Sequence, residues 1–304
     1  MEDYAAKFVN NLPDNLMNIK TPIRLDLVLE GGVFNGSFHV GVLFFLKEME
    51  KRNIVKVERI SGVSIGALMG FLYFSNNLHL ITDLYKLIYI DFKKTHYLKM
   101  IKQLNKILGD KIPENICETV HKRLYICYYN GTTCKKIVKN KYNNTDVLIN
   151  TIVKSSFVPH FIDGNMLYKN KYVDGIIPYI FKNKLKKKIL YVDLFGHDKL
   201  SHFFNIKNEK TNEHRMLVGL LDAHHFFIKQ QNTSMCSYVE NWNIMHKFSY
   251  FLKILFEKVC LYVIIIIVRV KKLLPLDAHT YVISKIILNM LPDMISLLLD
   301  AYCI

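Results

Sequence analysis

Residues 57–74 read VERISGVSIGALMGFLYF, and this stretch decides the predicted fold. Residues 57–61 are typical of a short strand, and residues 67–74 are apolar on all sides, as in a buried helix. Between them, Gly62 and Gly66 flank Ser64. A chain that turns sharply from strand to helix at a serine presents its hydroxyl above the end of a sheet.

The preceding segment has the same organisation. Residues 25–30, LDLVLE, have the pattern of a buried strand, and Gly31-Gly32 form a turn. After Gly36, apolar residues recur at helical spacing as far as Met49. Strand, helix, strand and helix in close succession predict an α/β fold with a mainly parallel sheet.

The Gly62-Val63-Ser64-Ile65-Gly66 motif is typical of a serine nucleophile. Glycine on both sides of Ser64 removes the Cβ atoms that would block the turn and the approach of a substrate. The N-terminus of the following helix favours a developing negative charge. The same pentapeptide also occurs as a small-residue loop without a catalytic role, so the motif alone leaves both interpretations open.

A second glycine loop, Gly31-Gly32-Val33-Phe34-Asn35-Gly36, also connects a predicted strand to a predicted helix. Its backbone N–H groups are suited to bind a phosphate or an oxyanion. Val33 occupies the middle glycine position of a dinucleotide-binding fingerprint, and no Gly-Lys-Ser/Thr sequence follows. Two glycine turns at neighbouring strand ends suit acyl transfer, in which one presents the nucleophile and the other stabilises the oxyanion. The alternative is a glycine turn that only starts a helix.

An aspartate at the end of another short predicted strand completes the set. Residues 166–175, MLYKNKYVDG, predict a hairpin that turns at Lys169-Asn170 and ends at Asp174-Gly175. Asp-Gly is also an ordinary turn dipeptide, as at Asp163-Gly164. Asp174 differs because it follows an apolar pair that would bury it and hold it rigidly.

Together these residues resemble the patatin-like phospholipases, a family of lipid acyl hydrolases. That family shows a glycine-rich loop, then Gly-x-Ser-x-Gly, then Asp-Gly-Gly or Asp-Gly-Ala, and the three motifs occur here in the same order. Ser155, Ser156 and Pro159 resemble the segment that precedes the family aspartate, and residues 34–41 resemble the animal triglyceride-lipase branch. The resemblance covers about residues 23–196, and it departs from the family pattern at Val33, Asn35 and Ile176.

The resemblance implies a three-layer sandwich with a mainly parallel sheet flanked by helices. It implies a Ser64–Asp174 dyad in which Asp174 accepts the serine proton directly, and an acyl-enzyme formed on Ser64. The expected oxyanion hole is Gly31, Gly32, Val33 and Gly36, the nucleophile elbow includes Gly62 and Gly66, and Gly175 belongs to the aspartate motif. Val33 keeps its N–H donor, and Asn35 belongs to a residue type that tolerates left-handed backbone. No metal or cofactor is implied.

The expected activity is hydrolysis of lipid acyl esters, of the phospholipase A, lysophospholipase or acylglycerol lipase type. A Ser-His-Asp triad is an alternative, because His197 follows a predicted strand and lies near Asp193. His39 and His160 are interpreted as structural. Two further alternatives are a lipid acyltransferase and a catalytically impaired membrane-binding relative.

Charge and hydropathy favour a membrane surface over nucleic acid as the partner. The formal net charge is +15 over 304 residues, 51% of which are hydrophobic, and the mean hydropathy is +0.12. Lysines cluster at positions 182, 184 and 186–188, and the uncharged run 259–268 is shorter than the ~20 residues needed to span a bilayer. We expect a cytoplasmic protein that associates peripherally with anionic membranes; a transmembrane segment near 251–270 is the alternative.

The predicted organisation has three parts: a polar lead-in at 1–22, a catalytic domain at 23–196 and an apolar, helical C-terminal extension at 197–304. Within the catalytic domain, helices are expected over 80–125 and 146–156, and a strand over 189–195. The six cysteines lack the spacing of a zinc site and are expected to be reduced thiols. No oligomeric state is predicted.

Overall fold

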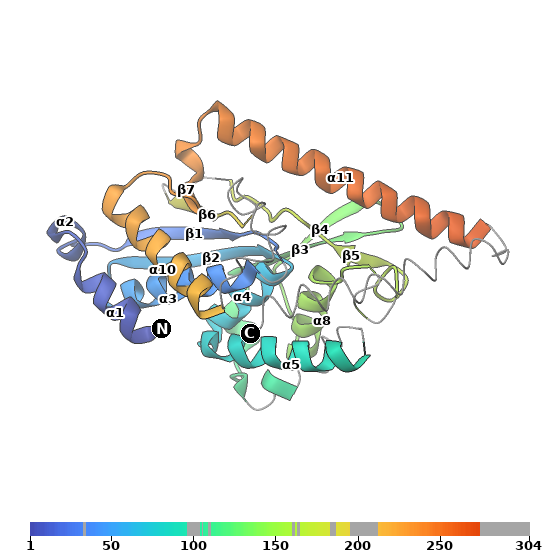
Figure 1. The fold of residues 1–304 in the computed structure, drawn as a ribbon, viewed down its shortest axis with the longest axis horizontal. Helices are drawn as coiled ribbons and strands as arrows, with labels where there is room; N and C mark the ends of the chain where they lie inside the picture. Colours follow the sequence, from blue (N-terminus) through green and yellow to red (C-terminus); the bar gives the residue numbers. More distant parts are fainter. Residues whose placement is uncertain are drawn as a thin grey trace.

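The structure is a computed structural model that describes residues 1–32, 35–95, 104, 106–108, 111–159, 162, 165–182, 187–194 and 212–273. Its centre is a mixed sheet in the order β4-β3-β2-β1-β6-β7, with β5 paired to β3 (Figure 1). The parallel strands are β1 (Ile23–Leu29), β2 (Val55–Val63), β3 (Leu124–Asn130) and β6 (Lys188–Val192). The antiparallel strands are β4 (Lys135–Lys139), β5 (Tyr172–Asp174) and β7 (Cys236–Tyr238).

Helices cover both faces of this sheet, which confirms the predicted α/β fold. One face carries α3 (Gly36–Lys51), α4 (Ile65–Phe74), α8 (Thr145–Ser155) and α10 (Asn212–Lys229) (Figure 1). Other helical elements in this part of the chain are η2 (Leu78–Leu80), α5 (Ile81–Thr95), α7 (Ile116–Val120) and η5 (Val239–Asn241). The long helix α11 (Ile244–Leu273) crosses the opposite side of the sheet (Figure 1). The two helical layers are therefore unequal, and α11 dominates the thinner one.

Residues 1–22 are part of the folded body rather than a polar lead-in. They form α1 (Glu2–Asn10) and α2 (Asp14–Met17), and they bury Ala5, Val9, Leu12 and Leu16 in the main core. These four positions recur every three or four residues, which is the spacing of one helix face. The composition of this segment is polar overall, so composition alone did not reveal these regularly spaced apolar residues.

The sheet also extends past residue 196, where the C-terminal extension was expected to begin. β7 pairs with β6 through Leu190–Tyr238 and Val192–Cys236, and α10 contributes Phe226 and Phe227 to the main core. The expected boundary therefore does not coincide with an edge of the sheet.

The helical prediction for residues 80–125 holds only in part among the described residues. α5 and α7 are helical, but Leu124 and Tyr125 begin β3, and β4 follows after a turn at Asn130. The Asn130 side chain accepts hydrogen bonds from the backbone N–H groups of Thr132 and Thr133, at 3.0 and 3.3 Å. The aromatic and β-branched composition of residues 124–129 is the strand signal.

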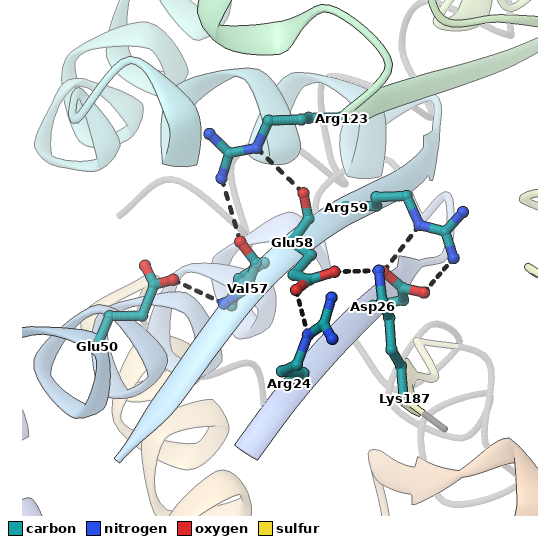
Figure 2. Close-up of polar contacts among 8 residues, drawn as sticks. All are labelled: Arg24, Asp26, Glu50, Val57, Glu58, Arg59, Arg123 and Lys187. Carbon is teal, nitrogen blue, oxygen red and sulfur yellow. Dashed lines mark hydrogen bonds and ion pairs between the residues drawn. The ribbon is translucent and has the colours of Figure 1, made fainter. Parts of the chain in front are cut away.

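Charged side chains stabilise an irregularity between β1 and β2 (Figure 2). The register shifts after Leu25, so that the backbone of Glu58 is not paired with any residue in the β1–β2 ladder. At this point Arg123 donates to the carbonyl oxygens of Val57 and Glu58, both at 3.1 Å. The Glu58 carboxylate forms ion pairs with Arg24 and Lys187 (Figure 2). The polar groups left open by the bulge therefore have partners.

Lys187, one of the clustered lysines, is paired with Glu58 and is not free to face a membrane. Lys187 is buried, whereas Lys182 and Lys188 are exposed. Lys184 and Lys186 lie outside the described residues.

The apolar run 259–268 lies within α11 and does not form a uniform anchor. Leu261 and Ile265 are buried against Tyr129, Leu167 and Val173. The other side of the helix exposes large apolar residues: Ile244, Met245, Phe248, Phe251, Leu252, Leu255, Phe256, Val259, Tyr262, Val263, Ile266 and Ile267. Within the described residues, α11 and its 251–270 portion included, no helix combines the length and apolar character required to cross a membrane.

Candidate active site

The carboxyl ends of β1, β2 and β6 meet at one edge of the sheet, and the candidate site lies there. Ser64 is the single residue between the end of β2 at Val63 and the start of α4 at Ile65. Its backbone has φ 52° and ψ −127°, a conformation that L-residues rarely adopt. The strand-to-helix turn predicted from the sequence is therefore present, and it holds the serine in a strained conformation.

Close backbone approach explains both glycines around Ser64. A Cβ atom at Gly62 would lie 2.4 Å from the carbonyl oxygen of Gly66. A Cβ atom at Gly66 would lie 2.4 Å from the carbonyl oxygen of Leu29 and 2.6 Å from that of Glu30. The turn can form next to β1 only because neither residue carries a side chain.

Ser155, at the end of α8, fixes the backbone of the turn. Its hydroxyl accepts a hydrogen bond from the Ser64 N–H at 3.0 Å and donates one to the Cys127 carbonyl oxygen at 2.6 Å. All three residues are buried, so this link between α8, the turn and β3 is shielded from water. The sequence drew attention to Ser155 only through the family resemblance and gave it no role.

Strand pairing explains how Asp174, far along the chain, reaches Ser64. β2 pairs with the first half of β3, ending at Val63–Cys127. β5 pairs with the second half of β3, ending at Asp174–Tyr128. β4 pairs along one side of β3. On the other side, β5 takes the place of β2 beyond the point where β2 ends. Val63, the residue before Ser64, and Asp174 therefore pair with two consecutive residues of β3, Cys127 and Tyr128. This pairing brings Ser64 and Asp174 close together.

Asp174 is half-buried and lines the same pocket as the candidate nucleophile, Ser64. Its Oδ1 atom has no hydrogen-bond partner among the described residues, while the Ser64 side chain and the Gly175 N–H interact favourably with the ionised carboxylate. Burial raises the pKa of Asp174 well above its ordinary value, and the nearby negative charge of Glu257 adds to this rise. A carboxylate held in this way is a stronger base than one in water.

The glycine loop lies directly beside the serine. A Cβ atom on Gly31 would lie 3.2 Å from the Ser64 Cβ, and Gly31 and Gly32 both line the pocket that contains Ser64 and Asp174. Asn35 has φ −69°, so its tolerance of left-handed backbone is not used. Val33 lies outside the described residues, and its expected donor role stays a prediction.

The pocket has a volume of about 230 Å³ and combines a polar floor with apolar walls. The floor is formed by the glycine loop, Ser64 and Asp174. Apolar walls come from the 158–159 and 173–176 segments and from α11, as follows: Val158, Pro159, Val173, Ile176, Leu261 and Ile264. Such walls suit an acyl chain whose ester carbonyl is held at Ser64.

The alternative of a Ser-His-Asp triad stays a prediction, because it depends on His197, which lies outside the described residues. Asp193 forms an ion pair with Lys253 at 2.9 Å, and His39 is fully buried within α3. His160, His197 and Asp163 lie outside the described residues. The pocket contains no histidine among its described lining residues.

Sequence reasoning missed the part of the site that comes from α11. Glu257 lines the pocket and is buried, and Lys253 approaches Glu30 just before the glycine loop. The available signal was a pair of opposite charges four residues apart inside an apolar helix, which is otherwise an unfavourable place for charge.

The glycine loop supports a prediction about turnover. A Cβ atom at Gly36 would lie 2.3 Å from the Ile65 Cγ1, so Gly36→Ala must displace the loop relative to the Ser64 turn. Loss of one oxyanion donor typically lowers kcat on the order of 10²–10³-fold. We expect a loss of that size in kcat for a soluble ester, with membrane binding nearly unchanged. A bulky residue at Gly32, whose Cβ would lie 2.8 Å from Leu194 Cδ1, is expected to act in the same direction.

Gly131→Ala is the matched control, because its Cβ would meet Leu167 at 2.9 Å but lies away from the pocket lining. It is expected to leave turnover unchanged. Equal losses of binding and turnover in the Gly36 variant would show instead that the loop docks the lipid. Val33→Gly, which restores the third glycine of the family pattern, is expected to keep or raise activity.

A serine on a strand-to-helix turn, in one pocket with a carboxylate and a glycine loop, is an arrangement typical of serine hydrolases. Residues 27–177 match the family model described as patatin-like phospholipase, so this part of the chain is a domain of that family. The match includes all three motifs and ends two residues after Gly175. A search of curated proteins found no match. Membership of this family supports lipid hydrolysis as the class of activity.

Proposed function

We propose that the chain hydrolyses acyl esters of membrane phospholipids or acylglycerols through a Ser64–Asp174 dyad. The observation that carries the proposal is that Ser64, on its strained strand-to-helix turn, lines one pocket with Asp174, Gly31 and Gly32. A base of raised basicity in contact with a nucleophilic hydroxyl is the arrangement that acyl transfer requires.

In the proposed reaction, the Ser64 Oγ attacks the ester carbonyl carbon while Asp174 takes the hydroxyl proton. The carbonyl oxygen becomes an oxyanion, which the N–H groups of the 31–33 loop stabilise. The ester C–O bond then breaks, and Asp174 returns the proton to the departing alcohol or lysolipid. Water next attacks the acyl-enzyme, gives up a proton to Asp174, and releases the fatty acid and Ser64.

A covalent probe tests whether Ser64 is activated. A fluorophosphonate should label Ser64 of the wild-type protein in a one-to-one ratio, as found by peptide mass spectrometry. Asp174→Asn should slow labelling strongly, because the hydroxyl then lacks a base. Labelling at another serine, or equal rates in the two proteins, would contradict the proposed dyad.

The exposed face of α11 and the net charge of +15 support peripheral binding to anionic membranes. Apolar side chains recur along the whole helix, and Lys258 and Arg269 are exposed among them. Such a face suits shallow insertion beside acidic headgroups. It belongs to the helix that also lines the pocket, which favours substrate entry from the bilayer.

Vesicle co-sedimentation should separate the two contributions. The Debye length falls from about 8 Å at physiological salt to roughly 3 Å at 1 M, so the charge-dependent part should be lost at high salt. Replacing Lys182, Lys184, Lys186 and Lys188 by glutamine should remove this part, with Lys187 kept because it pairs with Glu58. Serine at Phe256, Tyr262, Ile266 and Ile267 should remove the salt-resistant part.

These four positions were chosen because their side chains are exposed. Ile265 is left unchanged because it is only 6% exposed and its replacement would damage the core. Serine at Leu221 and Ile228, which are exposed apolar residues of α10, is the control and should leave binding intact. If the folded α11 variant binds vesicles like the wild type in 1 M salt, the proposed insertion is wrong.

A further inference from the structure

Two charged residues of α11 contact the two loops that form the candidate site. Lys253 and Glu257 are four residues apart, so they lie on the same side of the helix, one turn from each other. Glu257 is 4% exposed, and the Lys253 side chain is 17% exposed. Neither residue belongs to the family motifs, and neither is needed to transfer a proton in the proposed reaction.

Glu257 holds the backbone that follows Asp174. Its Oε1 accepts hydrogen bonds from the N–H groups of Ile176 and Ile177, both at 2.9 Å. Its Oε2 accepts one from the Tyr129 hydroxyl at 2.8 Å and lies 3.3 Å from the Lys136 Nζ. The carboxylate therefore joins α11 to the aspartate loop, to β3 and to β4.

Lys253 holds the residue that precedes the glycine loop. Its Nζ donates to Glu30 Oε1 at 2.8 Å and lies 2.9 Å from Asp193 Oδ2. Glu30, which is 1% exposed, also accepts hydrogen bonds from the Leu194 N–H at 2.9 Å and from the Tyr191 hydroxyl. Gly31 follows Glu30 directly, so this cluster fixes the start of the glycine loop.

We propose that Lys253 and Glu257 are positioning residues, through which one turn of α11 holds the glycine loop and the Asp174 loop at the separation that acyl transfer requires. This inference rests on the proposed function. The alternative is that Lys253 and Glu257 only anchor α11 to the protein. The residues that they contact favour the positioning role. Both side chains contact the residues immediately next to the catalytic loops, whereas Leu261 and Ile265 already pack the helix onto the protein.

Glu257 also acts on Asp174 through its charge. Among the described residues, Ser64, the Gly175 N–H and Glu257 of α11 act on Asp174, and Glu257 itself contacts Lys136 of β4 and Tyr129 of β3. Burial raises the pKa of Asp174 first, and the Glu257 charge raises it further. Removing this charge while keeping the hydrogen bonds should therefore lower the pH at which the base ionises.

The test compares Glu257→Gln with Glu257→Leu on a soluble short-chain ester, so that membrane binding does not enter. Glutamine can still accept from the two N–H groups; we expect it to keep most of kcat and to move the acid limb of the kcat/KM profile to lower pH. Leucine cannot accept these bonds, and a misplacement of about 1 Å can lower rates roughly 10²-fold. We expect kcat to fall about 10- to 100-fold with KM nearly unchanged.

Hydrogen exchange gives a readout that is independent of activity. The amides of Ile176 and Ile177 should lose protection in the leucine variant and keep it in the glutamine variant. Lys253→Met should also lower kcat, while Lys247→Met, at an exposed position of the same helix, should not. If the leucine variant fails to fold, the shift in the acid limb of the kcat/KM profile of Glu257→Gln tests the proposal.

Wild-type kcat in a folded Glu257→Leu protein would overturn the proposal. So would equal losses in the glutamine and leucine variants without a change in exchange at residues 176–177, or a glutamine variant whose acid limb does not move. Failure of the proposed function is distinguishable, because the wild-type protein would then not react with the phosphonate at Ser64, whatever the exchange data show.

Discussion

Replacing Ser64 with alanine is expected to abolish acyl release while the protein stays folded. Loss of the nucleophile in serine hydrolases lowers kcat on the order of 10⁴-fold or more. The side-chain hydroxyl is the only group removed, and the backbone bond from the Ser64 N–H to Ser155 is unaffected. Circular dichroism and thermal unfolding should therefore match the wild type.

Retention of most of the esterase rate by a purified, folded Ser64→Ala protein would mean that another residue is the nucleophile. Ser155→Ala is the informative companion variant. It removes the support of the turn without removing the nucleophile, so we expect a partial loss of kcat and lower thermal stability.

The second large effect is expected for Asp174→Asn. Asparagine preserves the shape of the side chain but cannot accept the serine proton, and loss of a general base typically lowers kcat about 10²- to 10⁴-fold. Asp163→Asn and His197→Ala are expected to keep activity. A large loss for His197→Ala with a normal fold would indicate a triad instead.

Asp174→Asn is expected to lower activity but not thermal stability. Because the folded-state pKa of Asp174 is raised, ionising it at neutral pH opposes folding, and this penalty disappears as the pH falls below the ordinary aspartate value of about 4. Asparagine carries no such penalty. Asp174→Asn should thus match or exceed the wild type in thermal stability at pH 7 and lose that advantage near pH 4.

The raised pKa also sets the pH dependence of the wild-type enzyme. Asp174 is active as a base only when it is ionised, so kcat/KM should rise with pH through a value well above that of an ordinary aspartate. An acid limb near pH 4 would show that the carboxylate is solvated in solution and would contradict the buried site.

The local signals in the sequence predicted the nucleophile turn well. Glycine spacing and a strand-to-helix change of pattern are properties of neighbouring residues, so Ser64, Gly62 and Gly66 could be identified directly. The hairpin at Lys169-Asn170 was also recognisable, and both residues have positive φ, at 49° and 55°. Tyr168 and Tyr172 form the expected bridge before β5.

Long-range pairing could not be predicted in the same way. Nothing in residues 172–174 indicates that they pair with Tyr128 and the two residues after it, where β2 has ended. The meeting of Ser64 and Asp174 was implied only by the family resemblance. For the same reason Lys253 and Glu257 gave no sign of their partners, because ion pairs that span 223 residues to Glu30 and 121 residues to Lys136 leave no local pattern.

The most direct test of the central claim is mass spectrometry of lipid products after incubation with mixed phospholipid and acylglycerol vesicles in ¹⁸O-labelled water. Hydrolysis through an acyl-enzyme on Ser64 predicts free fatty acid carrying ¹⁸O, with the matching lysolipid or partial glyceride, and no product with Ser64→Ala. Acyl groups moved to another lipid without free fatty acid would show a transferase. Vesicles left unchanged by a bound wild-type protein would contradict the enzyme and show a membrane-binding relative.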